Sequence, residues 1–515
     1  MLNTWLIIAG FTLSAGTGGA FTIALPSVTP AELRSLDQPE TTSTNAVVRL
    51  IVKPIISQWP EIKRFYTNHN IRVVKTLSSI GNFQIVEVPV VKSNLFELPE
   101  TLKLFSSIES GITPSFDVRP DGTRAIGYGR AVSLPTSDPL FAFSEDHFVP
   151  YDSSTAVKTF QWSITNSGQS IQAYQRFQDA WVPYLGRQPE PAGTNASLHV
   201  AEAWQIRDNA KGIRLCIIDS GIAENNPDLP LDSVLLHDAG GDPVCFSASS
   251  TSRLSGSPMN ITSNVLADIF DRSGHGTEMA GLACAVRDNG IGISGIAPGA
   301  DLLVARMASF SLDEAIASID WAIENKADVI NCSWGFDVDS PVLRSAIEAA
   351  EHAEIVLVCA VLNAPFDYDT GVEDYPARYK RSPLYYGGFG NIAAVCSTMS
   401  DDRLFPGGTG WGKNTVDFGA PGRRLPTTGI GSLPFKSVSG TSVATAQVSA
   451  CLAILKAEYP AESAAGLIDR LLQSADPVPS LAETTISGGR VNLHKALLFG
   501  RSVSKPGMLR FSFVH

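Results

Sequence analysis

The stretch RLCIID, from Arg214 to Asp219, is apolar after its first residue and ends in a carboxylate. Four further runs share this apolar, non-alternating character: DLLVARM (301–307), ADVINCS (327–333), EIVLVCAV (354–361) and NIAAVCS (391–397). Such runs are typical of strands in a parallel sheet that is covered on both faces. Because helix-like segments separate them, we predict an α/β domain with a doubly wound, mostly parallel sheet.

The segment that follows DLLVARM carries a helix start signal. Ser311 and Glu314 have the spacing of a capping box. Apolar residues further along share one helical face: Ala315, Ile316, Ile319, Ala322 and Ile323. We therefore expect an amphipathic helix that begins at Ser311.

Three polar residues stand where strands end or helices begin, and in such sheets sites form at the carboxyl ends of the strands. Asp219 ends RLCIID, and His275 lies in a glycine-flanked turn before an apolar run. Ser442 repeats that arrangement in SGTSVATAQVSACLAIL, residues 439–455. The N–H groups and positive dipole end of a helix start favour a developing negative charge.

Each of these residues also has an ordinary structural interpretation. Asp219 can be a turn residue, His275 a satisfied histidine at a helix start, and Ser442 an N-cap. Together they point to chemistry, because a serine hydroxyl is a nucleophile only when a base removes its proton. An imidazole is that base when a carboxylate holds its tautomer and stabilises its cation.

The blocks around these three residues resemble the signature blocks of the subtilisin-like serine proteases, the subtilases. The matching segments are IIDSGI with NPDL, SGHGTEMAGLACAVRDNGIGISGIAPGA, SGTSVATAQVSA and, between them, INCSWG, YPARY and VDFGAPG. The resemblance covers roughly residues 137–500. It implies a subtilisin-like fold and a serine endopeptidase that hydrolyses polypeptides through an acyl-enzyme, with Asp219, His275 and Ser442 as the triad.

The resemblance also implies roles around the triad. Asn363 would donate to the oxyanion of the tetrahedral intermediate, together with the Ser442 backbone N–H. Ser333, Trp334 and Gly335 would pair with the substrate main chain, although core packing is the alternative for Trp334. Leu362 stands where the family usually has glycine, so we expect a shallower pocket for the residue before the scissile bond.

Two other departures remove no reacting group, and one pair suggests a metal. Glu278 replaces the second histidine of the HGTH block, and Ala446 replaces a proline after the nucleophile. Asp228 and Asn289 match family positions that bind calcium, with ordinary loop residues as the alternative. We expect no cofactor for catalysis and a structural calcium ion at that pair.

Composition divides the rest of the chain. We interpret residues 1–20 as a signal peptide, 21–44 as a linker, 45–119 as a small domain, 120–160 as a connecting and processing segment, 161–500 as the catalytic domain and 501–515 as a tail. Within the small domain we predict strands at 47–53, 71–77, 83–91 and 112–118, and helices at 56–70 and 94–108. This βαββαβ order is the ferredoxin-like pattern.

The small domain resembles the inhibitor-type propeptide of the same family. That resemblance implies an intramolecular inhibitor, removed by self-cleavage within residues 115–140. Together with the signal peptide it suggests a secreted, monomeric zymogen that is not membrane-bound after signal removal, with an uncleaved anchor as the alternative. Asn195 and Asn260 are glycosylation sequons in a eukaryotic host, whereas Asn331 falls within a strand and is discounted.

Composition excludes some partners and leaves two other functions to weigh. The net charge is -12, which disfavours nucleic acid and anionic membranes, and the seven cysteines lie mostly in apolar runs. An inactive subtilase-like binding protein is one alternative. A nucleotide-binding protein is the other, because GTGWGKNT (408–415) faintly resembles a P-loop, although its spacing is wrong.

Overall fold

The computed structural model describes residues 47–89, 105–110, 148–150, 155–158, 161–164, 172–177, 180–183, 196–230, 245–247, 269–382, 384 and 387–500. Several predictions fall outside these residues: the signal peptide, the linker, the strand at 112–118, most of the helix at 94–108, the tail, and the sequons at Asn195 and Asn260. Within the described residues, no helix is long and apolar enough to cross a membrane.

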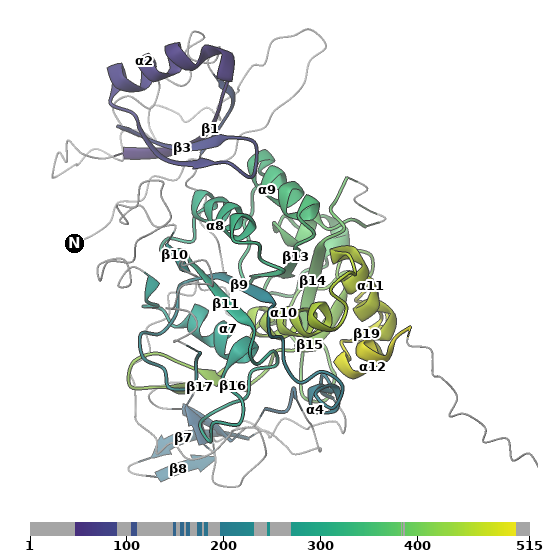
Figure 1. Ribbon diagram of the computed structural model, residues 1–515. Helices are drawn as coiled ribbons and strands as arrows, with labels where there is room; N and C mark the ends of the chain where they lie inside the picture. Colours follow the sequence, from purple (N-terminus) through teal and green to yellow (C-terminus); the bar gives the residue numbers. More distant parts are fainter. Residues whose placement is uncertain are drawn as a thin grey trace, which may run out of the picture. The chain divides into compact units, whose positions relative to one another are not determined.

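The centre of the molecule is a nine-stranded sheet (Figure 1). In spatial order its strands are β10 (Cys245–Ser247), β11 (Asp301–Arg306), β9 (Arg214–Asp219), β12 (Val329–Cys332), β13 (Val356–Ala360), β14 (Ile392–Thr398), β15 (Phe418–Pro421), β19 (Gly489–Arg490) and β18 (Asp476–Pro477). All neighbours pair in parallel except β18 and β19. The doubly wound, mostly parallel α/β prediction is therefore confirmed.

Helices cover both faces of the sheet. One face carries α4 (Val200–Ala203), α7 (His275–Cys284), α10 (Thr441–Glu458), α11 (Ala464–Ser474) and α12 (Leu493–Leu498), and the other carries α8 (Leu312–Glu324) and α9 (Pro341–His352). Successive strand residues alternate between the two cores, since Leu215 and Ile217 pack with α7 and α10 whereas Cys216 and Ile218 pack with α8 and α9. Both faces of β9 are thus apolar because both are buried.

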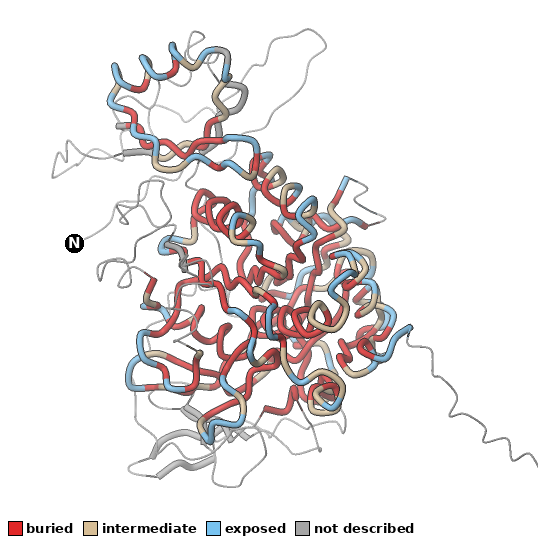
Figure 2. The backbone as a smooth tube through the Cα atoms, in the orientation of Figure 1, coloured by how far each residue is buried: buried red, intermediate tan, exposed pale blue. Residues whose placement is uncertain are grey.

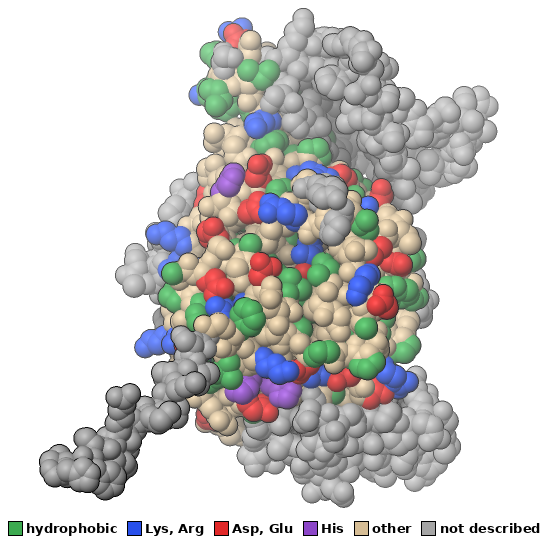
Figure 3. Space-filling view, turned by 90° about the vertical axis from the view of Figure 1, so that its right-hand side faces the viewer, with side chains coloured by type: hydrophobic (Ala, Val, Ile, Leu, Met, Phe, Trp, Pro, Cys, Tyr) green, Lys and Arg blue, Asp and Glu red, His purple; other side chains and the backbone are tan. Residues whose placement is uncertain are grey.

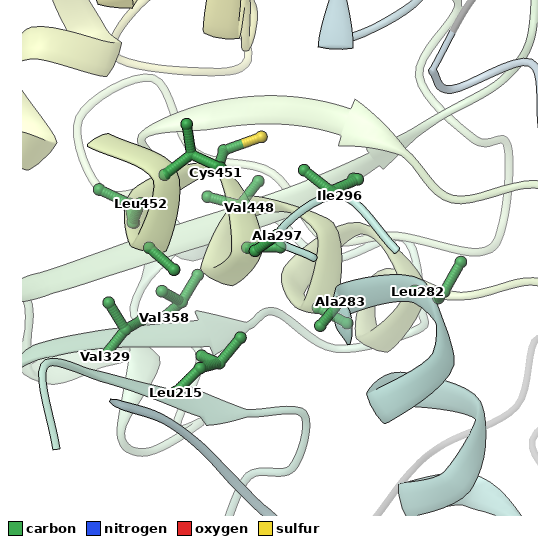
Figure 4. Close-up of a cluster of buried hydrophobic side chains, with 14 of the residues drawn as sticks. Leu215, Leu282, Ala283, Ile296, Ala297, Val329, Val358, Val448, Cys451 and Leu452 are labelled. Carbon is green, nitrogen blue, oxygen red and sulfur yellow. The ribbon is translucent and has the colours of Figure 1, made fainter. Parts of the chain in front are cut away.

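Helix α10 lies in the core of the first face. Its residues from Thr441 to Leu455 are all buried, and Figure 2 shows the surrounding strands and α7 buried with it. Figure 4 shows Leu215, Val329 and Val358 on the strands, Leu282 and Ala283 on α7, and Val448, Cys451 and Leu452 on α10. The first turn of α10 is consequently held rigidly at the sheet, which matters for Ser442.

Smaller elements complete the described structure. They are the hairpin β16 (Leu425–Thr428) with β17 (Phe435–Val438), the 3-10 turns η3 (Tyr368–Thr370) and η4 (Ala377–Tyr379), and an antiparallel sheet of β5 (Phe148–Pro150), β6 (Thr155–Lys158), β7 (Gln172–Phe177) and β8 (Ala180–Pro183). On the described part of the face in Figure 3, acidic and basic side chains are interspersed.

The N-terminal segment forms its own sheet. It comprises β1 (Val47–Pro54), η1 (Ile56–Gln58), α2 (Trp59–His69), β2 (Arg72–Leu77), β3 (Phe83–Pro89) and β4 (Phe105–Ser110), with strand order β2-β3-β1-β4. The prediction that a helix continues to Ile108 was wrong, because residues 105–110 form a strand. Its backbone pairs antiparallel with β1, and this long-range ladder decides the conformation of a short, ambiguous segment.

The predicted capping box at the start of α8 is only half formed. Ser311 is the N-cap, but its hydroxyl donates to Asp313 at 2.6 Å and makes no cap hydrogen bond. Glu314 does reach back, accepting from the Ser309 backbone N–H at 2.8 Å. The acid of the box therefore stabilises the helix start, while the serine orients a neighbouring carboxylate.

Two further sequence interpretations concern buried side chains. The six described cysteines are all free and buried: Cys216, Cys284, Cys332, Cys359, Cys396 and Cys451. They behave as small apolar residues, as expected. Asn331 is fully buried in β12, which agrees with its exclusion as a glycosylation site.

Candidate active site

Asp219 and His275 meet at the carboxyl edge of the sheet. β9 ends at Asp219 and α7 begins at His275, whose Nδ1 lies 2.8 Å from one carboxylate oxygen and 2.9 Å from the other. The aspartate side chain is 1% exposed and the histidine side chain 25%. A carboxylate on Nδ1 selects the tautomer in which Nε2 accepts a proton.

The two glycines that flank His275 have separate structural reasons. Gly274 adopts a φ of 96°, a left-handed conformation that side chains rarely tolerate, at the N-cap of α7. At Gly276 a Cβ atom would lie 2.3 Å from the Gly221 carbonyl oxygen and 3.2 Å from the Asp219 Cβ. The missing side chain therefore lets the helix start approach the end of β9.

Asp271 organises this turn, and the sequence reasoning missed it. One of its oxygens accepts from the Ser220 hydroxyl at 2.9 Å and from the Gly274 N–H at 2.8 Å. The other accepts from both the N–H and the hydroxyl of Thr277. Asp271 thus ties the residue after Asp219 to the helix that carries His275. The only local signal is its position at the start of DRSGHGT.

Ser442 lies in the first turn of α10, where the N-cap is Gly440 and not the serine. The N-cap interpretation of Ser442 is therefore wrong. Its hydroxyl donates to the Ser333 carbonyl oxygen at 3.3 Å, and the Ser333 hydroxyl donates back to the Ser442 carbonyl oxygen at 3.2 Å. Because Ser333 directly follows β12, which pairs with β9, Ser442 is held at the same edge of the sheet as Asp219.

Asn363 lies three residues beyond the end of β13, beside the start of α10. Its amide oxygen accepts from the Thr441 N–H at 2.7 Å and from the Thr441 hydroxyl at 3.0 Å. These bonds fix the amide plane, with the oxygen on Thr441 and the NH₂ group directed elsewhere. An amide held in this way is a preorganised donor.

One recess collects most of the predicted binding residues. Its lining comprises Ser333, Trp334, Gly335, Ala360, Val361, Leu362, Asn363, Asp374, Thr441 and Ser442. The Trp334 side chain is buried, packs 5.4 Å from the Phe336 ring, and donates from Nε1 to the Ile218 carbonyl oxygen at 2.9 Å. Its indole is therefore a core element, and any strand-like substrate contact falls to its backbone. Asp374 is a lining residue that the sequence reasoning missed, although it directly precedes the YPARY block.

The two substituted family positions are accommodated locally. Glu278 is buried one turn after His275, and Lys436 of β17 donates to it at 2.6 Å. Burial raises the pKa of the Glu278 carboxyl, and the charges of Lys436 and His275 oppose that rise. Ala446 is buried within α10, which continues unbroken to Glu458.

Asp228 and Asn289 are hydrogen-bonded to each other. The Asn289 amide nitrogen donates to one Asp228 oxygen, and the Ile293 N–H donates to the other, both at 2.8 Å. A calcium ion requires oxygens that face a common point, whereas here an N–H group faces each carboxylate oxygen. Within the described residues, no cluster of three or more His, Cys, Asp or Glu side chains is placed to hold a metal. Structural calcium remains an untested prediction.

The P-loop-like segment 408–415 has a different use. The Asn414 N–H and amide group and the Thr415 hydroxyl all donate to the carboxylate of Asp369. The chain then enters strand β15 and not a helix. The donors that would be needed for a phosphate are engaged by an internal carboxylate, which disfavours the nucleotide-binding alternative.

The fold and this site define a class: a doubly wound α/β protein with a carboxylate–imidazole pair and a helix-start serine at the same edge of its sheet. The family model described as "Subtilase family" matches residues 210–497, more than half of the chain. The chain belongs to the subtilase family.

Named relatives agree with that assignment. Thermitase of Thermoactinomyces vulgaris is 30% identical over 306 residues, which cover 59% of this chain and 94% of that protein. The minor extracellular protease Epr of Bacillus subtilis (strain 168) is 32% identical over 270 residues, which cover 52% of this chain and 35% of Epr. The match thus spans about a third of Epr, and 62% of the thermostable alkaline protease of Halalkalibacterium halodurans.

A solved structure is similar in fold. The crystal structure of fervidolysin from Fervidobacterium pennivorans, titled a keratinolytic enzyme related to subtilisin, matches with a TM-score of 0.57 at 17% identity. The match covers 89% of this chain and 62% of that one. At 17% identity, this similarity supports a shared fold and nothing further.

Proposed function

We propose that this chain is a serine endopeptidase that hydrolyses polypeptides with Asp219, His275 and Ser442 as its triad. The observation that carries the proposal is the hydrogen bond of His275 Nδ1 to the buried Asp219 carboxylate at 2.8 Å, at the same sheet edge as Ser442. Relatives named as proteases support the same chemistry. A binding protein would have no use for an oriented imidazole, an oriented amide and a helix-start serine at one edge of the sheet.

The first chemical step is acylation. Ser442 Oγ attacks the scissile carbonyl carbon while its proton passes to His275 Nε2, and the Asp219 carboxylate stabilises the imidazolium that forms. The tetrahedral intermediate collapses, the C–N bond breaks, and the amine leaves with the proton held by His275. Water then hydrolyses the acyl-enzyme with the same base, which restores the serine.

The negative charge on the tetrahedral intermediate would be stabilised by hydrogen-bond donors that are already oriented. The Asn363 amide oxygen is bound to Thr441, so its NH₂ group is the donor for the oxyanion. The Ser442 N–H, in the first turn of an 18-residue helix, is the second donor and adds the positive end of the helix dipole. Neither donor needs to reorganise during the reaction.

Two assays test the proposal together. The wild-type chain should hydrolyse casein and react covalently with a serine-directed phosphonate, and Ser442→Ala should do neither. A Ser345→Ala control removes an exposed hydroxyl of α9 and should leave both unchanged. Labelling of Ser442→Ala, or no labelling of the folded wild type, would contradict the triad.

We further propose that the N-terminal sheet is a propeptide that holds the enzyme latent in a secreted zymogen. Its contacts fall on the acidic side chains of α8. Arg49 pairs with Asp313 at 2.7 Å, Lys75 with Asp320 at 3.5 Å, and the Ser79 N–H donates to Asp320 at 3.0 Å. Burial raises the pKa of both aspartates, so these cations offset a desolvation cost.

The latency proposal is tested on the full chain. Ser442→Ala should remain uncut between the two parts, while the wild type is processed within residues 115–140. The double variant Arg49→Met with Lys75→Met should gain casein activity sooner than the wild type. Arg72→Met is the control, because Arg72 pairs with Glu87 within the N-terminal sheet. If casein activity appeared after the same delay in the wild type, the double variant and Arg72→Met, these contacts would not be what keeps the enzyme latent.

A further inference from the structure

The recess beside Ser442 and Asn363 contains one ionisable lining residue, Asp374. Its other lining residues are apolar, glycine, hydroxyl or amide types. Asp374 directly precedes Tyr375, two residues before η4 begins, and it is 2% exposed. A carboxylate that is buried at the wall of a substrate pocket carries a desolvation cost, which a partner must offset.

Within the described residues, the hydrogen bond of the Asp374 carboxylate is made through Oδ2. The Tyr368 hydroxyl donates to Oδ2, and the same hydroxyl accepts the Leu362 backbone N–H at 2.7 Å. The pocket wall at Leu362 and the carboxylate are therefore joined through a single phenol. Across the described part of the chain, no Lys or Arg side chain forms an ion pair with Asp374.

The other oxygen, Oδ1, faces Gly335. A Cβ atom on that glycine would lie 2.0 Å from Oδ1, so any other residue at position 335 would collide with the carboxylate. Gly335 also belongs to the segment expected to pair with the substrate main chain. The second acceptor atom of Asp374 thus lies against the segment along which the substrate would run.

The electrostatic surroundings of Asp374 are negative. Asp337, in the loop after β12, raises the pKa of the Asp374 carboxyl further after the larger effect of burial, and Tyr368 opposes the rise, with a resulting pKa of about 7. Glu373 is an exposed neighbour in sequence. Burial raises the pKa of the Tyr368 phenol, and the positive charge of Arg378 opposes that rise. The pocket is therefore complementary to a cation and repels an acidic side chain.

We propose that Asp374 makes this pocket selective for a basic side chain, Lys or Arg, at the residue before the scissile bond. The apolar stem of such a side chain would pack along Leu362, and its charged head would reach Oδ1 of Asp374. Leu362 lines the recess and would compete with an aromatic ring for space, and a neutral aliphatic chain would give Oδ1 of Asp374 no cationic partner. An unbranched stem fits beside Leu362, and a positive charge at its end can pair with Asp374.

This inference rests on the proposed endopeptidase activity, so the assay separates the two. Peptides that differ only at that residue, carrying Lys, Arg, norleucine, Phe or Glu, are compared by kcat/KM. Norleucine has an unbranched aliphatic stem without the charge. We expect kcat/KM for the Lys and Arg peptides to exceed that for the norleucine peptide by about tenfold or more, because only they pair with the desolvated carboxylate. Phosphonate labelling and casein hydrolysis with no preference for Lys or Arg would overturn the inference and leave the activity intact.

The decisive variant is Asp374→Asn, whose amide oxygen can still accept from Tyr368. Its kcat/KM for the Lys peptide should fall by about tenfold or more, while that for the norleucine peptide stays near the wild-type value. The unchanged norleucine rate shows that the variant is folded. Glu373→Gln is the matched control, because it removes the neighbouring charge outside the pocket. An equal loss for Lys and norleucine peptides would indicate a structural role and refute the proposal.

A pH series on the wild type needs no variant. The ratio of kcat/KM for Lys over norleucine cancels pH effects on the catalytic steps that both substrates share. As the pH rises from 6 to 8, Asp374 loses its proton and the ratio should increase. The same ratio should be flat in Asp374→Asn. A flat ratio in the wild type would contradict the inference.

Discussion

Two carboxylate–imidazole pairs in this molecule differ in how the histidine is held. At the carboxyl edge of the sheet, His275 places Nδ1 on the Asp219 carboxylate. Near β18, His199 contacts carboxylates with both ring nitrogens: Nδ1 lies 3.2 Å from Glu202, and Nε2 lies 3.3 Å from Asp476. Carboxylates on both nitrogens stabilise the cationic form of this imidazole and leave neither nitrogen facing a substrate.

The carboxylates of the two pairs differ as much as the histidines. Asp476 also accepts from Arg490, Asn492 and Lys495, and its hydrogen bonds hold its pKa below the usual range despite burial. The pKa of His199 is raised, chiefly by its bond to Asp476. This second cluster is a structural ion network that lines a separate recess. An Asp–His contact is therefore a candidate catalytic site only when the second ring nitrogen faces a group that can react.

The largest effect is expected from removing each histidine in turn. His275→Ala should lower kcat by roughly a millionfold, because the base is lost together with the activation of Ser442. His199→Ala should leave kcat close to the wild-type value and lower the unfolding midpoint instead. Casein or peptide turnover and thermal melts of both variants measure the contrast. Loss of turnover in folded His199→Ala would break the distinction.

The aspartates should separate in the same way. Asp219→Asn should reduce kcat by about ten-thousandfold, since the amide favours the wrong imidazole tautomer. Asp476→Asn should instead cost about 3 kcal/mol of folding free energy, because it leaves Arg490 without one partner for a buried guanidinium. Turnover and urea unfolding of each variant provide the test. A loss of turnover in Asp476→Asn that exceeds its unfolded fraction would contradict a purely structural role for Asp476.

How far the sequence predicts these features depends on their range along the chain. Buried strands such as Arg214–Asp219 were predicted because their apolar pattern is local. Residues 105–110 were predicted partly as helix because their strand conformation depends on pairing with β1, more than 50 residues away.

The candidate site shows the same limit. Asp219, His275 and Ser442 stand out by local glycine-rich signatures. The roles of Asp271 and Asp374 depend on contacts with Ser220 and with Gly335, which only the fold brings near. No local pattern distinguishes such carboxylates from ordinary loop acids.

A smaller effect on turnover is expected at Asn363. Asn363→Ala should lower kcat by about a hundredfold to a thousandfold, equivalent to about 2.7–4 kcal/mol, by removing one oxyanion donor. Asn391 is a matched buried asparagine, whose amide donates to the Ile355 carbonyl oxygen at 2.9 Å. Asn391→Ala should reduce stability and spare kcat. Similar kcat values for Asn363→Ala and the wild type would remove this residue from the oxyanion site.

The smallest effect concerns the pH dependence of stability at His199. Its pKa is raised in the folded state, so its charge contributes stability that is fully present below its unfolded pKa of about 6.5. That contribution is lost as the pH rises through the higher folded pKa. The difference in unfolding free energy between the wild type and His199→Gln should be about 1–2 kcal/mol at pH 5.5 and smaller at pH 9. Urea titrations at both pH values measure it, and a difference that grows with pH would mean that His199 is neutral in its cluster.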